Sequence, residues 1–397
     1  MNRNVVVLTA ATCAVGTQTF VFAGLLIELA ADMGITVAVA GYLAAAYALT
    51  YAFTAPFIAL RTGQLERRRL LWIALLVLGV INLCAAVASS FTELISLRVM
   101  AGLGATLVTP VVPAVVASLL PPERRGPALA MVMGGMVLAF MFGMPLGSLI
   151  GAQFGWRATF ILAAVLCVSA AVAVRLVLPQ VTSEDQSGWR LLKLGWHPPV
   201  RRLLIMTLTS FCATFCVVPF IAPVMKIIIG STEWVAFSQM LVGVGALCGV
   251  VIAGRLGNPS NPGLVLKRAF LVVGATQILY SSSMIWLPGL GVISWIGLSS
   301  AVVFGASALF FMSPLMQAQL LEAAPHARQV TLALNGSMMF LGQGAGAALG
   351  AQVTQHFSMP MIGLAGASVA MVGWYCARRL QASPIGMAAD DPRADTA

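Results

Sequence analysis

The stretch Gly134-Gly-Met-Val-Leu-Ala-Phe-Met-Phe-Gly-Met-Pro-Leu-Gly-Ser-Leu-Ile-Gly-Ala-Gln153 is apolar for nearly its whole length and carries no charged residue. Five of its twenty residues are glycine, and Pro145 lies among them. In the interior of a soluble helix a glycine costs about 1 kcal/mol and a proline about 3 kcal/mol. In a bilayer, small residues let helices approach closely, and neighbouring helices satisfy the backbone groups that a proline frees. The stretch therefore predicts a membrane-spanning helix.

The same glycine pattern occurs a second time in the chain. Gly143-x-x-x-Gly147-x-x-x-Gly151-Ala-Gln is repeated as Gly342-x-x-x-Gly346-x-x-x-Gly350-Ala-Gln, at an offset of 342 − 143 = 199 residues. The chain has 397 residues, so the offset is half of its length. Small-residue spacing alone is common in membrane helices, but this offset predicts two similar halves.

The composition excludes most soluble classes of protein. Hydrophobic residues make up 60% of the chain and charged residues 9%, whereas soluble domains have about 25% charged residues. At roughly 20 residues per span, the chain has room for about twelve spans and for no soluble catalytic domain. The net charge of +10 follows from the loops and not from a nucleic-acid-binding surface. We expect neither an enzyme nor a cofactor or metal site.

The apolar runs predict an all-α integral membrane protein with twelve transmembrane helices in two pseudo-symmetric six-helix bundles. The N-terminal bundle covers residues 1–178, a cytoplasmic linker residues 179–201, the C-terminal bundle residues 202–380, and a disordered cytoplasmic tail residues 381–397. The predicted spans are 5–27, 38–60, 70–90, 94–118, 127–153, 157–178, 202–225, 235–256, 267–287, 291–320, 329–352 and 358–377.

The positions of Lys and Arg predict the orientation. With the N-terminus in the cytoplasm, all 22 basic residues except Arg98, Arg157 and Lys226 fall on the cytoplasmic side, which leaves 22 − 3 = 19 there. Cytoplasmic loops are rich in Lys and Arg. Both termini are therefore expected in the cytoplasm, at the inner membrane of a bacterium.

Five short stretches carry a specific resemblance to known sequences. They are Ala40–Leu49 in span 2, Arg98-x-x-x-Gly102-x-Gly104-Ala105 in span 4, Pro122-Glu-Arg-Arg-Gly126 before span 5, Gly143-x-Pro145-x-Gly147-x-x-x-Gly151 in span 5 and Gly155-Trp-Arg157-Ala-Thr-Phe160 at span 6. Together they resemble the drug:proton antiporter and sugar-efflux (arabinose-efflux-permease-like) branch of the major facilitator superfamily, whose fold is two parallel six-helix repeats.

The resemblance implies a secondary active transporter, with no cofactor and as a monomer. Two bundles would rock about a central site, so that the site opens alternately to each side of the bilayer. The expected activity is efflux of a small neutral or amphipathic compound, a drug or a sugar, in exchange for protons. A proton-independent facilitator or an importer stays open as an alternative. A membrane enzyme or a receptor fits less well, because the chain has neither a catalytic cluster nor a soluble domain.

Two positions depart from the family pattern. The loop between spans 2 and 3 keeps the basic residues Arg67, Arg68 and Arg69, but Gly63 stands where the family has aspartate, so the acid is absent unless Glu66 substitutes for it. An acidic residue midway along span 1 is replaced by Thr19. The first departure puts the cytoplasmic charge contact of the family in doubt, and the second does the same for proton coupling.

The sharpest candidate residue is Arg98, because a charge at membrane depth costs a few kcal/mol unless it meets polar groups. Either Arg98 serves a proton relay or attracts an anionic group, or it snorkels to the outer interface. Glu28 is the only acid on a helix expected to line the pathway, and it is either part of that pathway or an interfacial cap. The uncharged polar candidates for the substrate and ion pathway are Gln18, Thr19, Tyr47, Thr106, Gln239, Ser313, Gln317, Asn335 and Gln343.

The repeated glycines are predicted to act in the conformational change. Spans 5 and 11 are expected at the interface between the bundles, where their small residues let the bundles slide past each other. Leucine in place of a central glycine should then block that motion. The residues of this predicted interface are Gly143, Pro145, Gly147, Gly151, Gly342, Gly346 and Gly350.

Overall fold

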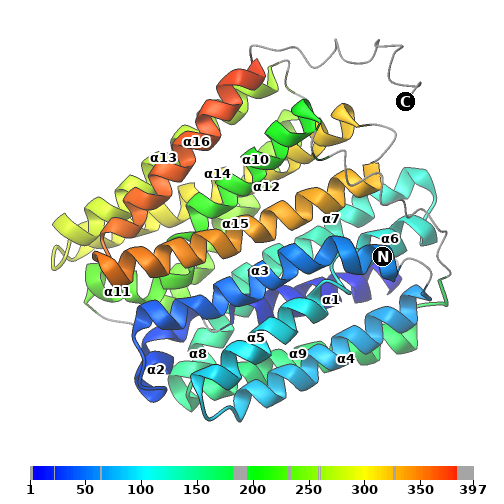
Figure 1. The fold of residues 1–397 in the computed structure, drawn as a ribbon, viewed down its shortest axis with the longest axis horizontal. Helices are drawn as coiled ribbons and strands as arrows, with labels where there is room; N and C mark the ends of the chain where they lie inside the picture. The colour runs from blue at the N-terminus through cyan, green and yellow to red at the C-terminus, as the bar shows by residue number, and fades with distance from the viewer. Residues whose placement is uncertain are drawn as a thin grey trace.

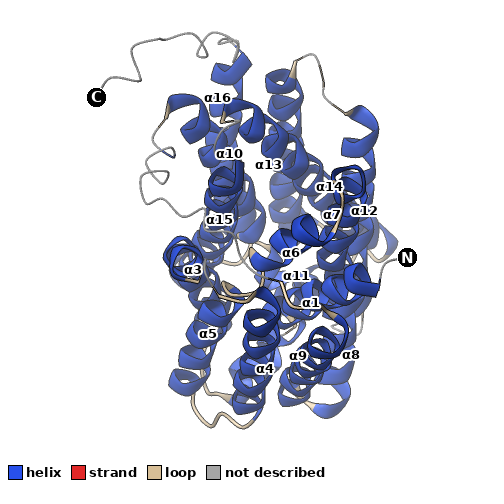
Figure 2. Cartoon of the chain, turned by 90° about the vertical axis from the view of Figure 1, so that its right-hand side faces the viewer, coloured by secondary structure: helices blue, strands red, loops and turns tan. Residues whose placement is uncertain are grey.

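The structure is a computed structural model of the whole chain that describes residues 3–21, 23–62, 65–181, 195, 197–230, 234–257, 259, 261–324 and 328–381. The described residues form helices joined by short turns, and Figure 2 shows no strand among them. Gly63, most of the predicted linker and nearly all of the predicted tail lie outside the described residues.

Each predicted span corresponds to one helix or to consecutive helical pieces (Figure 1). In the first half, residues 3–181, these are α1 (Arg3–Phe20), η1 (Ala23–Leu25), α2 (Leu26–Asp32), α3 (Val37–Arg61), α4 (Arg67–Ala86), α5 (Phe91–Ala105), α6 (Val111–Leu119), α7 (Pro122–Leu138), η2 (Ala139–Gly143), α8 (Met144–Phe154) and α9 (Trp156–Val177). In the second half, residues 197–381, they are α10 (Pro198–Phe215), η4 (Val218–Phe220), α11 (Ile221–Ile229), α12 (Val235–Leu256), α13 (Pro262–Trp286), α14 (Val292–Ala323), α15 (Arg328–His356) and α16 (Met361–Gln381).

In the described part of the chain, nine segments are long and apolar enough to cross a membrane, where consecutive helical pieces are taken together as one segment. The remaining predicted spans fall short for local reasons. Residues 91–119 are divided into α5 and α6 by turns at 106–110, so neither piece reaches the length of a span. α15 and α16 are long enough but are not among the nine, and each ends in basic residues, His356 in α15 and Arg378 and Arg379 in α16.

Helix starts and interruptions follow from individual residues. Thr36, Glu66, Ser90 and Asn261 cap the starts of α3, α4, α5 and α13, each accepting a backbone N–H of the first turn with its side chain. In span 5 the helix widens into the π-helical turn η2 directly before Pro145, and the Met144 N–H donates to the Ala139 carbonyl. Single π-helical turns are rare and are frequent at functional sites.

The two halves pack as separate groups (Figure 2), and η1 and α2 of the first half meet η4 and α11 of the second. α3 packs along α15, and α12 packs against η2 and α8. We call the end of the molecule where α2 ends and α3 begins the Asp32 end, and the end where α3 ends and α4 begins the Glu66 end.

The hydrophobic core shows which end is closed. Toward the Asp32 end, buried residues of both halves form one continuous cluster, which includes Phe20, Phe140, Phe215 and Phe220. Toward the Glu66 end there are two clusters, one in each half, and among the described residues Phe340 is the only buried second-half residue in the first-half cluster. The halves are thus packed together at the Asp32 end and have separate cores at the Glu66 end.

Candidate transport site

Arg98 lies inside the first half, where it caps the end of a broken helix. Its side chain is 1% exposed, and its two terminal nitrogens donate to the carbonyl oxygens of Gln18 at 3.0 Å and Thr19 at 2.9 Å. α1 ends at Phe20, and the last carbonyls of a helix have no N–H partner within it. A cation there also complements the helix dipole. These contacts exclude the interpretation that Arg98 snorkels to the interface.

Gln18, Thr19 and Tyr47 complete this group, which we call the Arg98 node. The Gln18 amide donates to the Tyr47 hydroxyl at 3.0 Å, and the hydroxyls of Thr19 and Tyr47 lie 2.9 Å apart. The Arg98 guanidinium stacks on the Tyr47 ring, 4.7 Å from its centre. The structure therefore brings together four residues that the sequence singled out separately. All four are buried, so the Arg98 node is a buried polar contact between α1, α3 and α5.

Gln239 joins the two halves. Its amide lies 2.6 Å from the Ser148 hydroxyl of α8. In the amide orientation that satisfies every neighbour, the nitrogen donates to the Met144 carbonyl at 3.1 Å and the oxygen accepts the Gly24 N–H at 3.2 Å. Gln239 is fully buried, so a second-half side chain supplies hydrogen bonds to the break in span 1 and to span 5. Where α15 packs along α3, Gln352 of α15 donates to the Tyr42 hydroxyl of α3 at 2.5 Å.

The other sequence candidates are dispersed. Asn335 accepts a hydrogen bond from Thr207 inside the second half, and Gln317 donates to Ser313 within α14. Thr106 bonds to its own helix end, Gln343 is buried in α15, and Glu28 is exposed in the first turn of α2. These residues do not share one polar pocket.

The repeated glycines face a different neighbour from the one predicted. A Cβ atom on Gly143 would lie 2.1 Å from Thr17, and one on Gly147 would lie 2.5 Å from Val21, both at the end of span 1. Gly151 meets Leu25 in the same way, and Pro145 lies between Gly143 and Gly147, in the first turn of α8. The glycine faces at 143, 147 and 151 therefore meet span 1 of their own half and not the opposite bundle, which corrects the prediction for these three residues.

The second half repeats this arrangement. Cβ atoms on Gly342, Gly346 and Gly350 would each lie 2.4 Å from a backbone carbonyl of Leu208, Cys212 and Cys216 respectively, all in span 7. Spans 5 and 11 do touch the opposite half, but through other residues: Met141 packs on Gly243 and Gly344 on Leu49. The physical reason is that a helix has several faces, and spacing alone does not say which neighbour the glycine face meets.

An aromatic cluster lies where the halves meet, and the sequence analysis missed it. The Phe20 and Phe140 rings stack with centres 5.0 Å apart, Phe20 lies 5.6 Å from Phe215, and Phe140 lies 5.6 Å from Phe310, edge to face. A cavity of about 30 Å³ adjoins the cluster. Its lining is uncharged and comes from Phe140, Thr214, Phe215, Val218, Val242, Gln277, Tyr280, Val302, Gly305, Ala306, Leu309 and Phe310. Gln277 and Tyr280 could have been noticed as polar residues within the apolar run 267–287.

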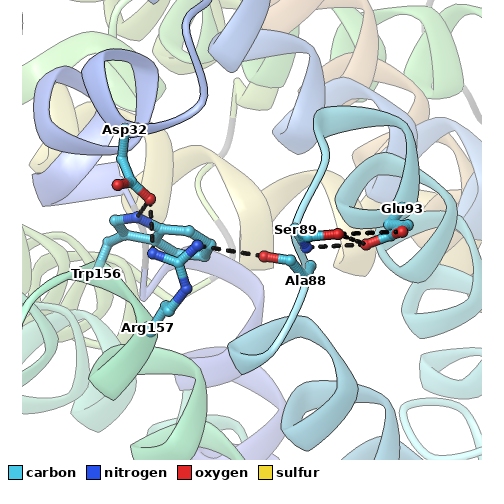
Figure 3. Close-up of polar contacts among 6 residues, drawn as sticks. All are labelled: Asp32, Ala88, Ser89, Glu93, Trp156 and Arg157. Carbon is cyan, nitrogen blue, oxygen red and sulfur yellow. Dashed lines mark hydrogen bonds and ion pairs between the residues drawn. The ribbon is translucent and has the colours of Figure 1, made fainter.

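Polar contacts also tie the first half at each of its ends. At the Asp32 end, Asp32 accepts from Trp156 at 3.0 Å and pairs with Arg157 at 2.6 Å, and Arg157 donates to the Ala88 carbonyl at 3.3 Å (Figure 3). Arg157 also stacks on Trp156, 4.3 Å from the ring centre. Glu93 caps the neighbouring turn through Ser89, as the same view shows.

At the Glu66 end, Glu66 stands beside the three arginines but binds backbone groups. Its carboxylate accepts the N–H of Arg68 at 2.9 Å, of Arg69 at 2.7 Å and of Val181 at 3.0 Å, and the Arg67 N–H donates to the Val181 carbonyl at 3.0 Å. Partial burial alone would raise the pKa of this carboxyl, but the three N–H donors and the Arg68 charge hold it below the ordinary value. Glu66 thus attaches the end of the first half to the start of α4.

Comparison with known proteins decides the family. A sequence profile of the Major Facilitator Superfamily matches residues 8–347. The chain belongs to this superfamily. A member of the superfamily with this fold is a transporter and not an enzyme, as the absence of a catalytic cluster in the sequence predicted.

One curated relative and two solved structures illustrate the similarity. The chloramphenicol resistance protein of Streptomyces lividans is 36% identical over 275 residues, which cover 67% of this chain and 70% of that protein. The crystal structure of a bacterial homologue of the human lysosomal transporter Spinster, inward-facing and unoccupied, has a TM-score of 0.71 at 15% identity and covers 94% of this chain and 96% of its own. A D-xylose–proton symporter has a TM-score of 0.74 at 16% identity, with the same coverage. The predicted fold is confirmed.

Proposed function

We propose that the chain exports an uncharged aromatic compound, of which chloramphenicol is the representative, by alternating access. The observation that carries this proposal is the aromatic, uncharged cavity at the junction of the halves. Small-molecule sites are mostly apolar with a few placed polar groups, and this lining has that character. The chloramphenicol resistance protein, which is 36% identical to this chain over 275 residues, supports the same class of substrate.

The proposed motion is a rocking of residues 1–178 against residues 202–380. The single core at the Asp32 end and the separate cores at the Glu66 end support a state that is closed at the first end. With the basic residues on the cytoplasmic side, the Glu66 end faces the cytoplasm and both termini lie there. The state is then inward-facing, in the inner membrane of a bacterium, where the monomer takes up its substrate.

Protons are the proposed coupling ion, in exchange for the substrate. The alternative, a proton-independent facilitator or importer, is favoured by one observation: the cavity lining contains no acidic side chain. Among the acids of the described residues, Asp32 pairs with Arg157, Glu66 and Glu93 cap helices, and Glu28 is exposed.

Accumulation of radiolabelled chloramphenicol in cells tests the proposal. Cells that express the chain should hold less drug than cells without it, and a protonophore should abolish the difference. Equal accumulation with and without the chain would contradict efflux of this class of compound. A difference that survives the protonophore would contradict proton coupling, and accumulation equal to or above that of cells without the chain would support the facilitator or importer alternative.

A further inference from the structure

The cavity beside the aromatic cluster belongs to the second half and has one wall from the first. Its lining comes from α10, η4, α12, α13 and α14, and among the described residues Phe140 of η2 is the single lining residue from the first half. At about 30 Å³ it has room for one or two water molecules and not for an aromatic ring. A ligand of drug size can enter only if part of the wall moves.

Phe140 is the part of the wall that the transport motion would move. It lies on the π-helical turn Ala139–Gly143 and is 5% exposed. Its ring is stacked on Phe20 of its own half and meets Phe310 of the other half edge to face. When the halves rock apart, Phe140 travels with the first half and the contact with Phe310 is lost. The ring then no longer closes the cavity.

The wall of the cavity opposite Phe140 carries two polar side chains. Gln277 and Tyr280 lie three residues apart on α13, on one face of the helix, and are 1% and 7% exposed. Within the described part of the chain, the Gln277 side-chain oxygen has no hydrogen-bond partner. It lies against Gly366 of α16, which offers only backbone. The last side-chain torsion of glutamine is soft, so the amide can turn toward a ligand.

We propose that Phe140 occupies, when no substrate is bound, the place that the aromatic ring of the substrate takes, and that Gln277 and Tyr280 form hydrogen bonds to a hydroxyl or amide on the side chain of that ring. This inference rests on the proposed function. Phe310 and Phe215 would then stack on the bound ring in place of Phe140. The uncharged lining favours a neutral ligand, because a buried charge without a partner is unfavourable.

Equilibrium binding of tritiated chloramphenicol to the full chain in lipid nanodiscs tests the inference. Phe140→Ala removes the competing ring and its two aromatic contacts, so the dissociation constant should fall about 3- to 10-fold. Gln277→Leu and Tyr280→Phe each remove one hydrogen bond to the ligand, so the dissociation constant should rise about 3- to 10-fold. Phe140→Leu, which keeps most of the volume, should shift binding in the same direction as the alanine variant but less.

Two substitutions outside the cavity serve as matched controls. Phe142→Ala changes a phenylalanine of the same turn that is 47% exposed, and Thr276→Val changes the neighbour of Gln277, whose hydroxyl is bonded within its own helix. Both should bind like the wild type. The inference is overturned if the Phe140 variants match Phe142→Ala, or if Gln277→Leu and Tyr280→Phe match Thr276→Val, while the wild type binds. Absence of binding to the wild type would overturn the substrate class itself, and this inference with it.

Discussion

Gly346→Ala should destabilise the second half, because the glycine lets two helices touch backbone to backbone. An added Cβ would lie 2.4 Å from the Cys212 carbonyl oxygen and 3.0 Å from the Phe215 carbonyl carbon. Ordinary contact begins at 3.4 Å, so α15 and α10 must separate by 3.4 − 2.4 = 1.0 Å. Backbone atoms cannot rotate away as a side chain can. Overpacking of this kind costs about 1–3 kcal/mol, which corresponds to a fall in melting temperature of roughly 2–12 °C.

Gly336→Ala is the matched control, because this glycine lies on the same helix with no heavy atom within 4 Å of its added Cβ. Alanine also favours a helix over glycine by about 1 kcal/mol, so this variant should melt at or above the wild-type temperature. The assay is thermal unfolding of the detergent-purified chain, followed by tryptophan fluorescence. Equal melting temperatures for Gly346→Ala and Gly336→Ala would refute the contact between α15 and α10.

Three further predictions concern the polar contacts. Arg98→Leu leaves two helix-end carbonyls without donors, so the free energy of unfolding should fall by about 1–3 kcal/mol. Thermal unfolding measures this change, and unchanged stability would contradict the Arg98 node. Gln239→Leu removes the hydrogen bonds of this side chain to Gly24, Met144 and Ser148, so a cysteine at Ala23 in a cysteine-free chain should react faster with a membrane-impermeant maleimide from the Asp32 end. An unchanged rate would argue that this contact does not close the Asp32 end. Glu66 has a lowered pKa, so its contribution is present above the ordinary glutamate value of about 4.3 and is lost as pH falls through the lower folded value. The melting-temperature difference between wild type and Glu66→Ala should therefore shrink as pH falls from about 5 to 3.5, and a difference independent of pH would contradict the role of the carboxylate.

The architecture could be predicted because lipid imposes a strong constraint on sequence. Every backbone group in the bilayer must be satisfied inside the protein, so apolar runs of about 20 residues become helices. The run 235–256 matches α12 residue for residue, and all of the run 291–320 except its first residue lies within the long helix α14. The breaks in spans 1, 4, 5 and 7 were not predicted, because they depend on partners such as Arg98 that come from distant parts of the chain.

The candidate site was harder to predict, because polarity marks residues but not their neighbours. The pattern singled out Gln18, Thr19, Tyr47 and Arg98, and the fold brings them together. The pattern did not indicate that these four residues would pack together as a buried contact between three helices. The aromatic residues of the cavity gave no signal, because phenylalanine is common in every membrane helix. Glu66 was noticed only as a substitute for an absent acid, and its bond to Val181 depends on two loops 115 residues apart.

Flux in proteoliposomes under an imposed proton gradient tests the central claim most directly. Purified chain would be reconstituted, and chloramphenicol movement and internal pH followed together, beside a panel of sugars and lipophilic drugs. We predict that the gradient drives chloramphenicol against its concentration difference while protons move in the opposite direction. Chloramphenicol movement that is indifferent to the gradient, with no proton counterflow, would contradict proton-coupled export.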